Sequence, residues 1–244
     1  MKNSLSLCLI TAAVAFSPVL SAEEESPHQI SANFTLTTDY LYRGISQTLE
    51  GPALQGGFDY SHAPTGFYVG TWASNVDFGG DANIEIDYYG GIAGELSNGI
   101  SWDFGGLYYQ YAGSDDEPEE DFFEAYASFG YTFADVAYEP SVGVGVNYSP
   151  DFFGEDGDAV YIYSSLDLSL PYELGLSFYV GYQDVEGDKL TGPAGFDYVH
   201  YSIGLSKSFG PLDLGVSWND ANDDCDGGTN ELCQAIVFSV SSSF

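Results

Sequence analysis

The last twelve residues decide the fold class: Cys233-Gln-Ala-Ile-Val-Phe-Ser-Val-Ser-Ser-Ser-Phe244. Apolar residues at positions 236, 238, 240 and 244 share one parity, and serines at 239, 241 and 243 share the other. This period of two predicts a strand with one apolar and one polar face. A strand at the chain end would expose an edge, unless it pairs with the first strand and closes a barrel.

The aromatic residue at the end of this strand points to one class of barrel. A chain that ends in an aromatic on its apolar face resembles the C-terminal signal of outer-membrane β-barrels, which the barrel-assembly machinery reads. We therefore expect the barrel-assembly machinery to recognise Phe244 and its strand, and outer-membrane lipid and lipopolysaccharide to be partners of the barrel. The test of this interpretation is whether the rest of the chain repeats the pattern.

The amino terminus has the features of a secretory signal. Lys2 precedes an apolar stretch over residues 5–16, which is too short to span a membrane. Ser21 and Ala22 then precede three glutamates. We predict a signal peptide over residues 1–22, a short periplasmic segment over 23–29, and a barrel over 30–244 in the bacterial outer membrane.

Charge and composition exclude several classes. The chain carries 37 Asp and Glu against 4 Lys and Arg, which excludes nucleic acid as a partner. Such acidity is typical of disorder, but 20 Tyr, 17 Phe and 3 Trp argue against it. No apolar run after the signal is long enough for a membrane helix. A soluble β-sandwich and a membrane barrel remain.

Strand length favours the barrel. We predict twelve strands, mostly longer than the roughly 5–6 residues usual in soluble proteins and close to the roughly 9–11 that span a membrane. Short connections alternate with longer acidic ones, as in outer-membrane barrels with short periplasmic turns and long extracellular loops. The predicted strands cover residues 30–41, 52–62, 67–77, 83–96, 100–112, 121–133, 137–149, 159–170, 174–184, 197–208, 212–220 and 233–244.

Apolar and polar residues alternate along most of these segments, so the apolar set should face lipid and the polar set the lumen. Near Gly105-Gly106 the pattern breaks, which predicts a bulge. Aromatic residues at strand ends predict girdles at the two lipid boundaries, the alternative being a soluble core. The girdle candidates are Tyr40, Phe67, Trp102, Phe133, Tyr148, Tyr172 and Trp218.

The first third of the chain carries denser motifs, Asp39-Tyr-Leu-Tyr-Arg-Gly-Ile-Ser-Gln-Thr48, Gln55-Gly-Gly-Phe-Asp-Tyr-Ser-His62, the segment 66–78, and Glu85-Ile-Asp-Tyr-Tyr-Gly90. They resemble the TorF-like porin family of proteobacteria, a family long described as of unknown function. The resemblance implies an outer-membrane barrel with a transport role. It supplies no established substrate and no functional residues.

Several carboxylates fall on or near the lumenal parity. One-signed charge around a water-filled, low-dielectric pore favours counter-ions, so these residues predict a cation-preferring channel for small solutes. The alternative is a closed structural or surface-binding barrel in which the acids pair with tyrosines, and whose acidic loops bind a partner or divalent cations. Inward tyrosines at 89, 126, 161, 163 and 179 should narrow the lumen. The pore-lining candidates are Asp39, Asp59, Glu85, Asp87, Glu124, Asp167 and Asp213, with Glu95 and Asp103 on or near the same face.

Arg43, the only arginine, lies just past the first predicted strand. Its guanidinium could fork onto an acid inside the mouth and anchor a loop, which we favour. It could equally lie at the surface and bind a lipopolysaccharide phosphate.

The loop over residues 220–231 is rich in oxygen ligands that calcium accepts, but its spacing does not fit an EF-hand, and an ordinary solvated loop is the preferred interpretation. Cys225 and Cys233 share the loop before the last strand, and secretion into an oxidising compartment predicts a disulfide between them. We expect no metal and no cofactor.

The sequence gives little support for an enzyme. It contains three histidines, His28, His62 and His200, and neither a G-x-S-x-G nor an H-E-x-x-H motif. A Ser-His-acid cluster on the barrel wall would require these groups to meet in the folded chain. We expect that the protein has no catalytic residues.

Overall fold

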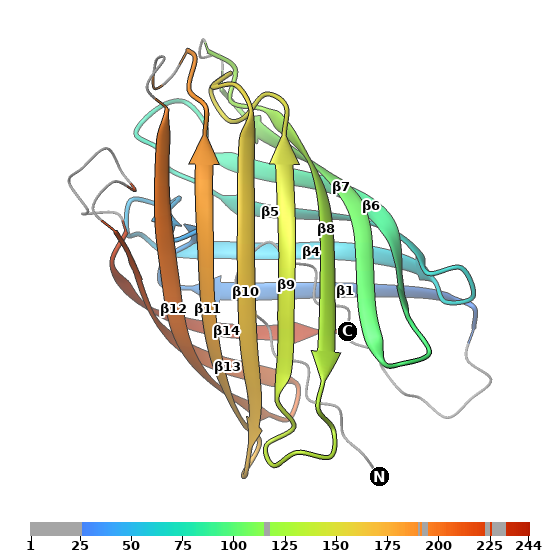
Figure 1. The fold of residues 1–244 in the computed structure, drawn as a ribbon. Helices are drawn as coiled ribbons and strands as arrows, with labels where there is room; N and C mark the ends of the chain where they lie inside the picture. The colour runs from blue at the N-terminus through green and yellow to red at the C-terminus, as the bar shows by residue number, and fades with distance from the viewer. Residues whose placement is uncertain (1–25, 115–117, 190, 192–194, 223–224, 226–232) are drawn as a thin grey trace.

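The structure of the protein, a computed structural model, describes residues 26–114, 118–189, 191, 195–222, 225 and 233–244 (Figure 1). The predicted signal peptide lies outside them. Within the described residues there is no helix long and apolar enough to cross a membrane. The strands are β1 (His28–Thr37), β2 (Leu41–Tyr42), β3 (Ile45–Ser46), β4 (Ala53–His62), β5 (Phe67–Asn75), β6 (Ile84–Glu95), β7 (Ile100–Ala112), β8 (Phe122–Thr132), β9 (Ser141–Ser149), β10 (Ala159–Leu170), β11 (Leu174–Val185), β12 (Phe196–Phe209), β13 (Leu212–Ala221) and β14 (Ala235–Ser243).

Twelve of these strands form a closed antiparallel barrel, in chain order, while β2 and β3 pair only with each other. The last strand closes the barrel against the first: Thr35 faces Ser241, and Ala32 and Phe244 exchange backbone hydrogen bonds of 3.1 and 2.9 Å. The terminal strand therefore leaves no free edge. The predicted fold class and the number of barrel strands are confirmed.

The strands are steeply tilted, as closure of a barrel requires. In Figure 1, β8 to β12 run upright at the front, while β1, β4 and β5 cross behind them. The short connections lie at one end of the barrel and the longer ones at the other, which is the arrangement of periplasmic turns and extracellular loops.

The outer face of the barrel is apolar. Large apolar side chains such as Leu54, Phe58, Val144, Ile162 and Ile203 are exposed on it. A soluble protein rarely presents so continuous an apolar surface, whereas a membrane barrel must present one to lipid. The apolar residues of the alternating pattern thus form the lipid-facing surface. The chain therefore folds as a β-barrel of the outer-membrane type.

Three local predictions were wrong. The strand expected over residues 137–149 begins at Ser141. The first strand ends at Thr37 rather than at residue 41. The expected bulge at Gly105-Gly106 is absent, because β7 keeps a continuous register with both β6 and β8. The glycine at position 105 is explained by a close contact instead: a Cβ there would collide with the phenol of Tyr126 on the neighbouring strand β8. The glycine makes room for an inward ring without breaking the ladder.

The predicted disulfide is confirmed. Cys225 and Cys233 are bonded, with their Cα atoms 6.5 Å apart. The bond joins the two ends of the loop that follows β13. Most of the segment 220–231, on which a calcium site was considered, lies outside the described residues.

Candidate functional site

The site begins with a small hairpin in the loop between β1 and β4. β2 and β3 are joined by Arg43 and Gly44, whose φ angles are 48° and 88°. Two consecutive residues with positive φ make the type I′ turn that matches the twist of paired strands. Asn-Gly is the usual sequence there, so Arg43 adopts a conformation that an L-residue enters only at a cost. We call residues 38–52 the lumenal hairpin.

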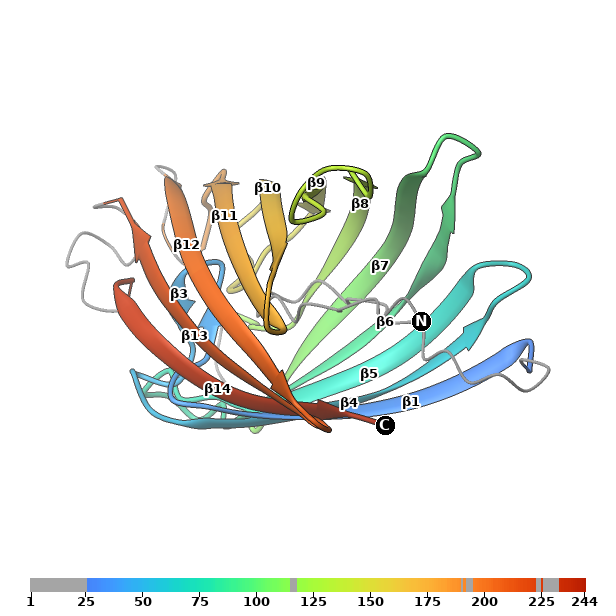
Figure 2. The ribbon, with the colours of Figure 1, turned by 90° about the horizontal axis from the view of Figure 1, so that it is seen from below.

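The lumenal hairpin lies inside the barrel. Tyr40 hydrogen-bonds Glu85 on β6, Arg43 reaches Glu124 on β8 and Gln183 on β11, and a Cβ on Gly44 would lie 2.7 Å from His200 Cβ on β12. Strands so far apart around the wall can be contacted together only from within. Figure 2, seen from below, places β3 inside the ring of strands.

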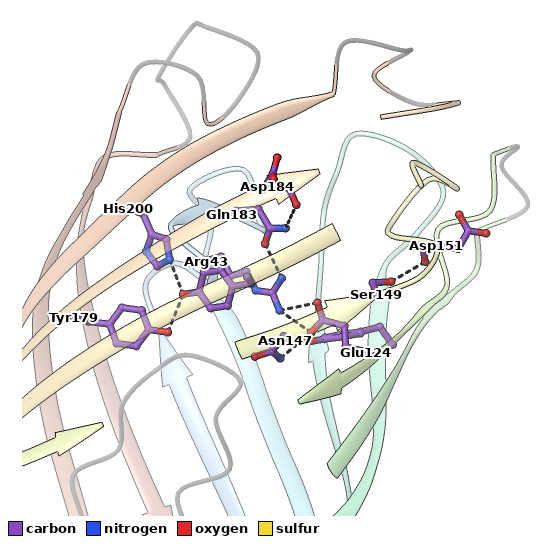
Figure 3. Close-up of polar contacts among 11 residues, drawn as sticks. Arg43, Glu124, Asn147, Ser149, Asp151, Tyr179, Gln183, Asp184 and His200 are labelled. Carbon is purple, nitrogen blue, oxygen red and sulfur yellow. Dashed lines mark hydrogen bonds and ion pairs between the residues drawn. The ribbon is translucent and has the colours of Figure 1, made fainter. Parts of the chain in front are cut away.

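Arg43 holds the tip of the hairpin across the lumen (Figure 3). Its NH2 donates to both carboxylate oxygens of Glu124, at 2.7 and 2.6 Å, and its NH1 donates to Gln183 Oε1 at 2.7 Å. The guanidinium also lies over the Tyr161 ring, 4.1 Å from its centroid, and over the Tyr42 ring at 4.7 Å. This combination of forked hydrogen bonds and stacking is one that lysine could not make.

The charge of Arg43 is preserved although the side chain is only 5% exposed. Burial lowers the pKa of the guanidinium, but Glu124 and the phenol of Tyr42 raise it by more, so the pKa lies well above its ordinary value. Because the side chain is enclosed, the alternative in which it binds lipopolysaccharide at the surface does not match its position. The observed contact with Glu124 fits the favoured interpretation, and the role of Arg43 in anchoring the loop stays a prediction.

The partners of this ion pair are themselves fixed. Glu124 Oε2 also accepts from Tyr109 at 3.1 Å and from Asn147 Nδ2 at 3.0 Å. Glu124 is therefore an anchor for the hairpin rather than a free wall charge. On the other side, the Tyr161 hydroxyl hydrogen-bonds His200 Nε2 and the Tyr179 hydroxyl, each at 2.8 Å (Figure 3).

Asp39 lies outside the wall strands, which corrects its predicted place on the first strand. Its Oδ1 accepts from Ser46 Oγ at 2.7 Å and Thr48 Oγ1 at 3.0 Å, so the carboxylate braces the base of the lumenal hairpin. Burial raises the pKa of Asp39, against the lowering effect of those two hydroxyls. The prediction failed because β1 ends four residues early.

Tyr40 corrects a second prediction. It was expected in a lipid-facing girdle, but it is buried in the lumenal hairpin and donates to Glu85 Oε1 at 2.9 Å. Glu85 and Asp87 lie on the inner face of β6, and both side chains are buried. Five of the other girdle candidates are exposed, as the prediction of a girdle requires: Phe67, Phe133, Tyr148, Tyr172 and Trp218.

The remaining candidate acids lie deeper in the lumen. Asp59 accepts from Tyr89 at 2.5 Å, and Asp103 accepts from Tyr68 at 2.6 Å. Asp213 accepts a hydrogen bond from Ser208 near the short-turn end. Asp167 faces Ser177 and Ser141 on the inner parity of β10. The acids thus form no single ring. The candidates that are nearly fully enclosed are Asp39, Glu85, Asp87 and Glu124.

Three polar contacts of this site were missed from the sequence: Gln183, Asn147 and Tyr109. Each lies on the inner parity of its strand, as do many other residues, so no local signal separated them. The hairpin itself had a signal, since Arg43-Gly44 between Leu41-Tyr42 and Ile45 fits a two-residue turn between short strands.

A family model for a bacterial protein of unknown function, Gcw_chp, matches residues 21–244. The chain belongs to this family. The description of Gcw_chp assigns no activity, and it does not confirm the TorF-like name that the sequence motifs suggested. No match to the chain is found among curated proteins.

Solved structures similar to this Gcw_chp chain include outer-membrane porins. The NanC porin has a TM-score of 0.55, is 8% identical, and is matched over 88% of this chain and 99% of that one. The KdgM porin in complex with disordered oligogalacturonate has a TM-score of 0.56, is 8% identical, and is matched over 88% and 97%. At this identity the likeness shows the fold, that of a bacterial outer-membrane barrel.

Proposed function

We propose that the protein is an outer-membrane channel through which small solutes diffuse, with a preference for cations set at the lumenal hairpin. One observation supports this most directly: the only arginine of the chain is neutralised by Glu124, while Glu85 and Asp87 beside the hairpin have no basic partner among the described residues. The narrowest part of the lumen would therefore carry net negative charge. In a low-dielectric wall such charge attracts cations and repels anions.

The basic residues lie where they cannot cancel this charge. In the part of the chain that the structure describes, Lys189 pairs with Glu155 in the extracellular loops at 2.5 Å, and Lys207 lies over the Phe209 ring near the short-turn end of β12. Lys207 shares the parity of Ile203 and Leu205, which face outward. Arg43 is therefore the one described basic side chain inside the barrel.

This charge separates the protein from one structural neighbour. Oligogalacturonate, bound by the KdgM porin, is a polyanion. A lumen with seven candidate carboxylates and one neutralised arginine should repel such a chain. The motifs between Tyr40 and Gly91 that resemble TorF-like porins support a transport role, and they name no solute.

A catalytic role has no comparable support. His28 hydrogen-bonds Tyr60, His62 hydrogen-bonds Thr65, and His200 hydrogen-bonds Tyr161. Among the described residues these contacts include no Ser-His-acid arrangement. We propose accordingly that the barrel is not an enzyme.

The proposal is tested with purified, refolded protein in a planar lipid bilayer under a KCl gradient. We expect steady single-channel current whose reversal potential lies closer to the equilibrium potential of K⁺ than to that of Cl⁻. A folded barrel that gives no current would instead support the closed structural or surface-binding barrel. Current with an anion-selective reversal potential would keep the channel and refute the role of the lumenal carboxylates.

A further inference from the structure

Glu85 and Asp87 are two buried carboxylates on the lumenal face of the wall. They lie two residues apart on the same face of β6, and their exposed fractions are 0% and 2%. One oxygen of each, Glu85 Oε2 and Asp87 Oδ1, has no hydrogen-bond partner. Two enclosed carboxylate oxygens without partners cost free energy, unless a positive group or a proton compensates them.

No side chain supplies that positive group. Arg43 directs its recorded hydrogen bonds to the two oxygens of Glu124 and to the Gln183 amide oxygen, and it forms no ion pair with Glu85 or Asp87. Tyr40 donates a single hydrogen bond to the other oxygen of Glu85. Among the described residues no Lys or Arg pairs with these two carboxylates, which lie within hydrogen-bonding reach of each other, so a shared proton or a bound cation must compensate their charge.

A third group in the same part of the lumen points to a ligand independently of the acids. Gln55 faces Ser74 on β5, and Ser74 faces Glu85 on β6, so the three inner-face residues lie on one row across the sheet. Gln55 is 5% exposed, and its Nε2 has no partner. The two ends of a side-chain amide can exchange places, so Gln55 can present its carbonyl oxygen instead.

We propose that Glu85 and Asp87, with the Gln55 amide nearby, bind a hard divalent cation of the Ca²⁺ class. Carboxylate and amide oxygens are the ligands such ions prefer, and a charge of +2 neutralises the pair. The ion would satisfy the two unpartnered oxygens directly. This inference deepens the proposed function, on which it rests for the entry of the cation into the lumen.

The ligand set predicts exchangeable rather than structural binding. Among the described residues there is no group of three or more His, Cys, Asp and Glu side chains that could hold a metal ion. Two carboxylates and an amide leave several coordination positions to water. Such a site binds an ion in passage and releases it, unlike a permanent metal centre.

Binding would also affect the hairpin. Tyr40, at its base, donates to Glu85 and packs edge-on against Trp72, with the ring centroids 5.4 Å apart. Trp72 is also the direct cross-strand neighbour of Asp87. A divalent ion on the pair would thus lie under the hairpin, where it should reduce the K⁺ current, and beside an indole that can report it.

The test uses Tb³⁺, a luminescent substitute for Ca²⁺ that is sensitised by nearby indole and phenol rings. Folded wild-type protein in detergent is titrated with TbCl₃, and the bound Tb³⁺ is then displaced with CaCl₂. We expect a saturable signal that Ca²⁺ removes. In Glu85→Gln and Asp87→Asn, which keep the side-chain shapes, the saturable Tb³⁺ signal that Ca²⁺ displaces should be lost.

Glu95→Gln is the matched control, since it makes the same change at the exposed end of the same strand. It should keep the saturable signal, and migration of unheated samples in gel electrophoresis checks that each variant is folded. The site would be refuted if wild type, Glu85→Gln and Asp87→Asn gave equal Tb³⁺ titrations. It would also be refuted if Ca²⁺ did not displace the Tb³⁺ signal of wild type. In either case a proton shared by Glu85 and Asp87 would explain their burial.

The two proposals fail separately. If wild type binds Tb³⁺ through Glu85 and Asp87 but carries no current in the bilayer, the site stands and the channel does not. If it conducts K⁺ but shows no such binding, and Ca²⁺ does not reduce the current, the channel stands and the site is refuted.

Discussion

The extracellular and periplasmic halves of the lumen are built differently. The extracellular half holds the lumenal hairpin, the Arg43–Glu124 pair and the enclosed acids of β6. On strands β9 to β14, the inner face of the periplasmic half carries mainly small residues, which include Gly143, Ser165, Ser177, Gly204, Ser206, Gly215, Ser239 and Ser241. The narrow half is thus made by a loop, and the wide half by the wall itself.

This difference teaches where selectivity should arise. A charge acts strongly on a passing ion only where the ion is within a Debye length, about 8 Å in physiological salt, and where little water intervenes. Glu85 and Asp87 meet both conditions, whereas Asp213, beside serines near the short-turn end, is half-buried. Changes in the hairpin should therefore have larger effects than the same changes in the periplasmic half.

The largest effect is expected from removal of the constriction. Residues 41–46 are replaced by Gly-Gly, which can join Tyr40 to Gln47 because the Gln47 N–H already donates to the Tyr40 carbonyl at 2.7 Å. The barrel should still form, since β2 and β3 belong to a separate sheet. Single-channel conductance should rise severalfold, and an unchanged conductance would show that the hairpin does not limit flow.

Arg43→Met should have the next largest effect. It leaves the Glu124 carboxylate buried without its cation, and breaking a buried pair from one side typically costs about 3–5 kcal/mol. We expect a loosened hairpin, noisy and higher conductance, and easier unfolding in urea. Conductance traces and urea unfolding measure the two effects.

Two variants control this prediction. Arg43→Lys keeps the charge without the fork and should fall between wild type and Arg43→Met. Arg43→Met combined with Glu124→Gln removes the stranded charge and should recover most of the lost stability. If the double variant is no more stable than Arg43→Met, the ion pair is not what holds the hairpin.

Asp39→Asn probes the base of the hairpin through pH. Because the pKa of Asp39 is raised in the docked hairpin, the docked hairpin binds a proton more tightly than the released loop does. Docking is therefore most favourable below the ordinary aspartate pKa of about 3.9, and it weakens as pH rises through the raised value. Wild-type conductance should increase with pH over this window.

In Asp39→Asn the part of this trend that comes from the hairpin should vanish, while the titration of the wall acids remains. The measurement is the difference between the two conductance curves from about pH 3 to pH 7. Parallel curves would separate Asp39 from hairpin docking.

The smallest effect is expected in the periplasmic half. Asp213→Asn removes one lumenal charge beside small side chains, where water and salt screen it. The reversal potential should move only slightly, and less than in Glu85→Gln. A shift as large as that of Glu85→Gln would mean that both halves set selectivity, which would break the comparison.

Much of the barrel could be predicted from the sequence because strand alternation is a local property. The period of two in residues such as Ile203 and Leu205 is imposed directly by lipid on one side and water on the other. The same rule failed for Asp39 and Tyr40, which fit a strand pattern but lie beyond the end of β1. A parity rule assigns a face only while the chain remains a strand.

The sequence by itself determined the class of the protein: a twelve-stranded barrel closed by its terminal strand, with a disulfide in its last loop and an acidic inner face. Only the tertiary structure decided what lies in the lumen. Arg43 and Glu124 are 81 residues apart, and Arg43 and Gln183 are 140 apart, so their meeting depends on the closure of the whole barrel. The wall follows from local periodicity, whereas the constriction follows from contacts between distant segments that no local pattern records.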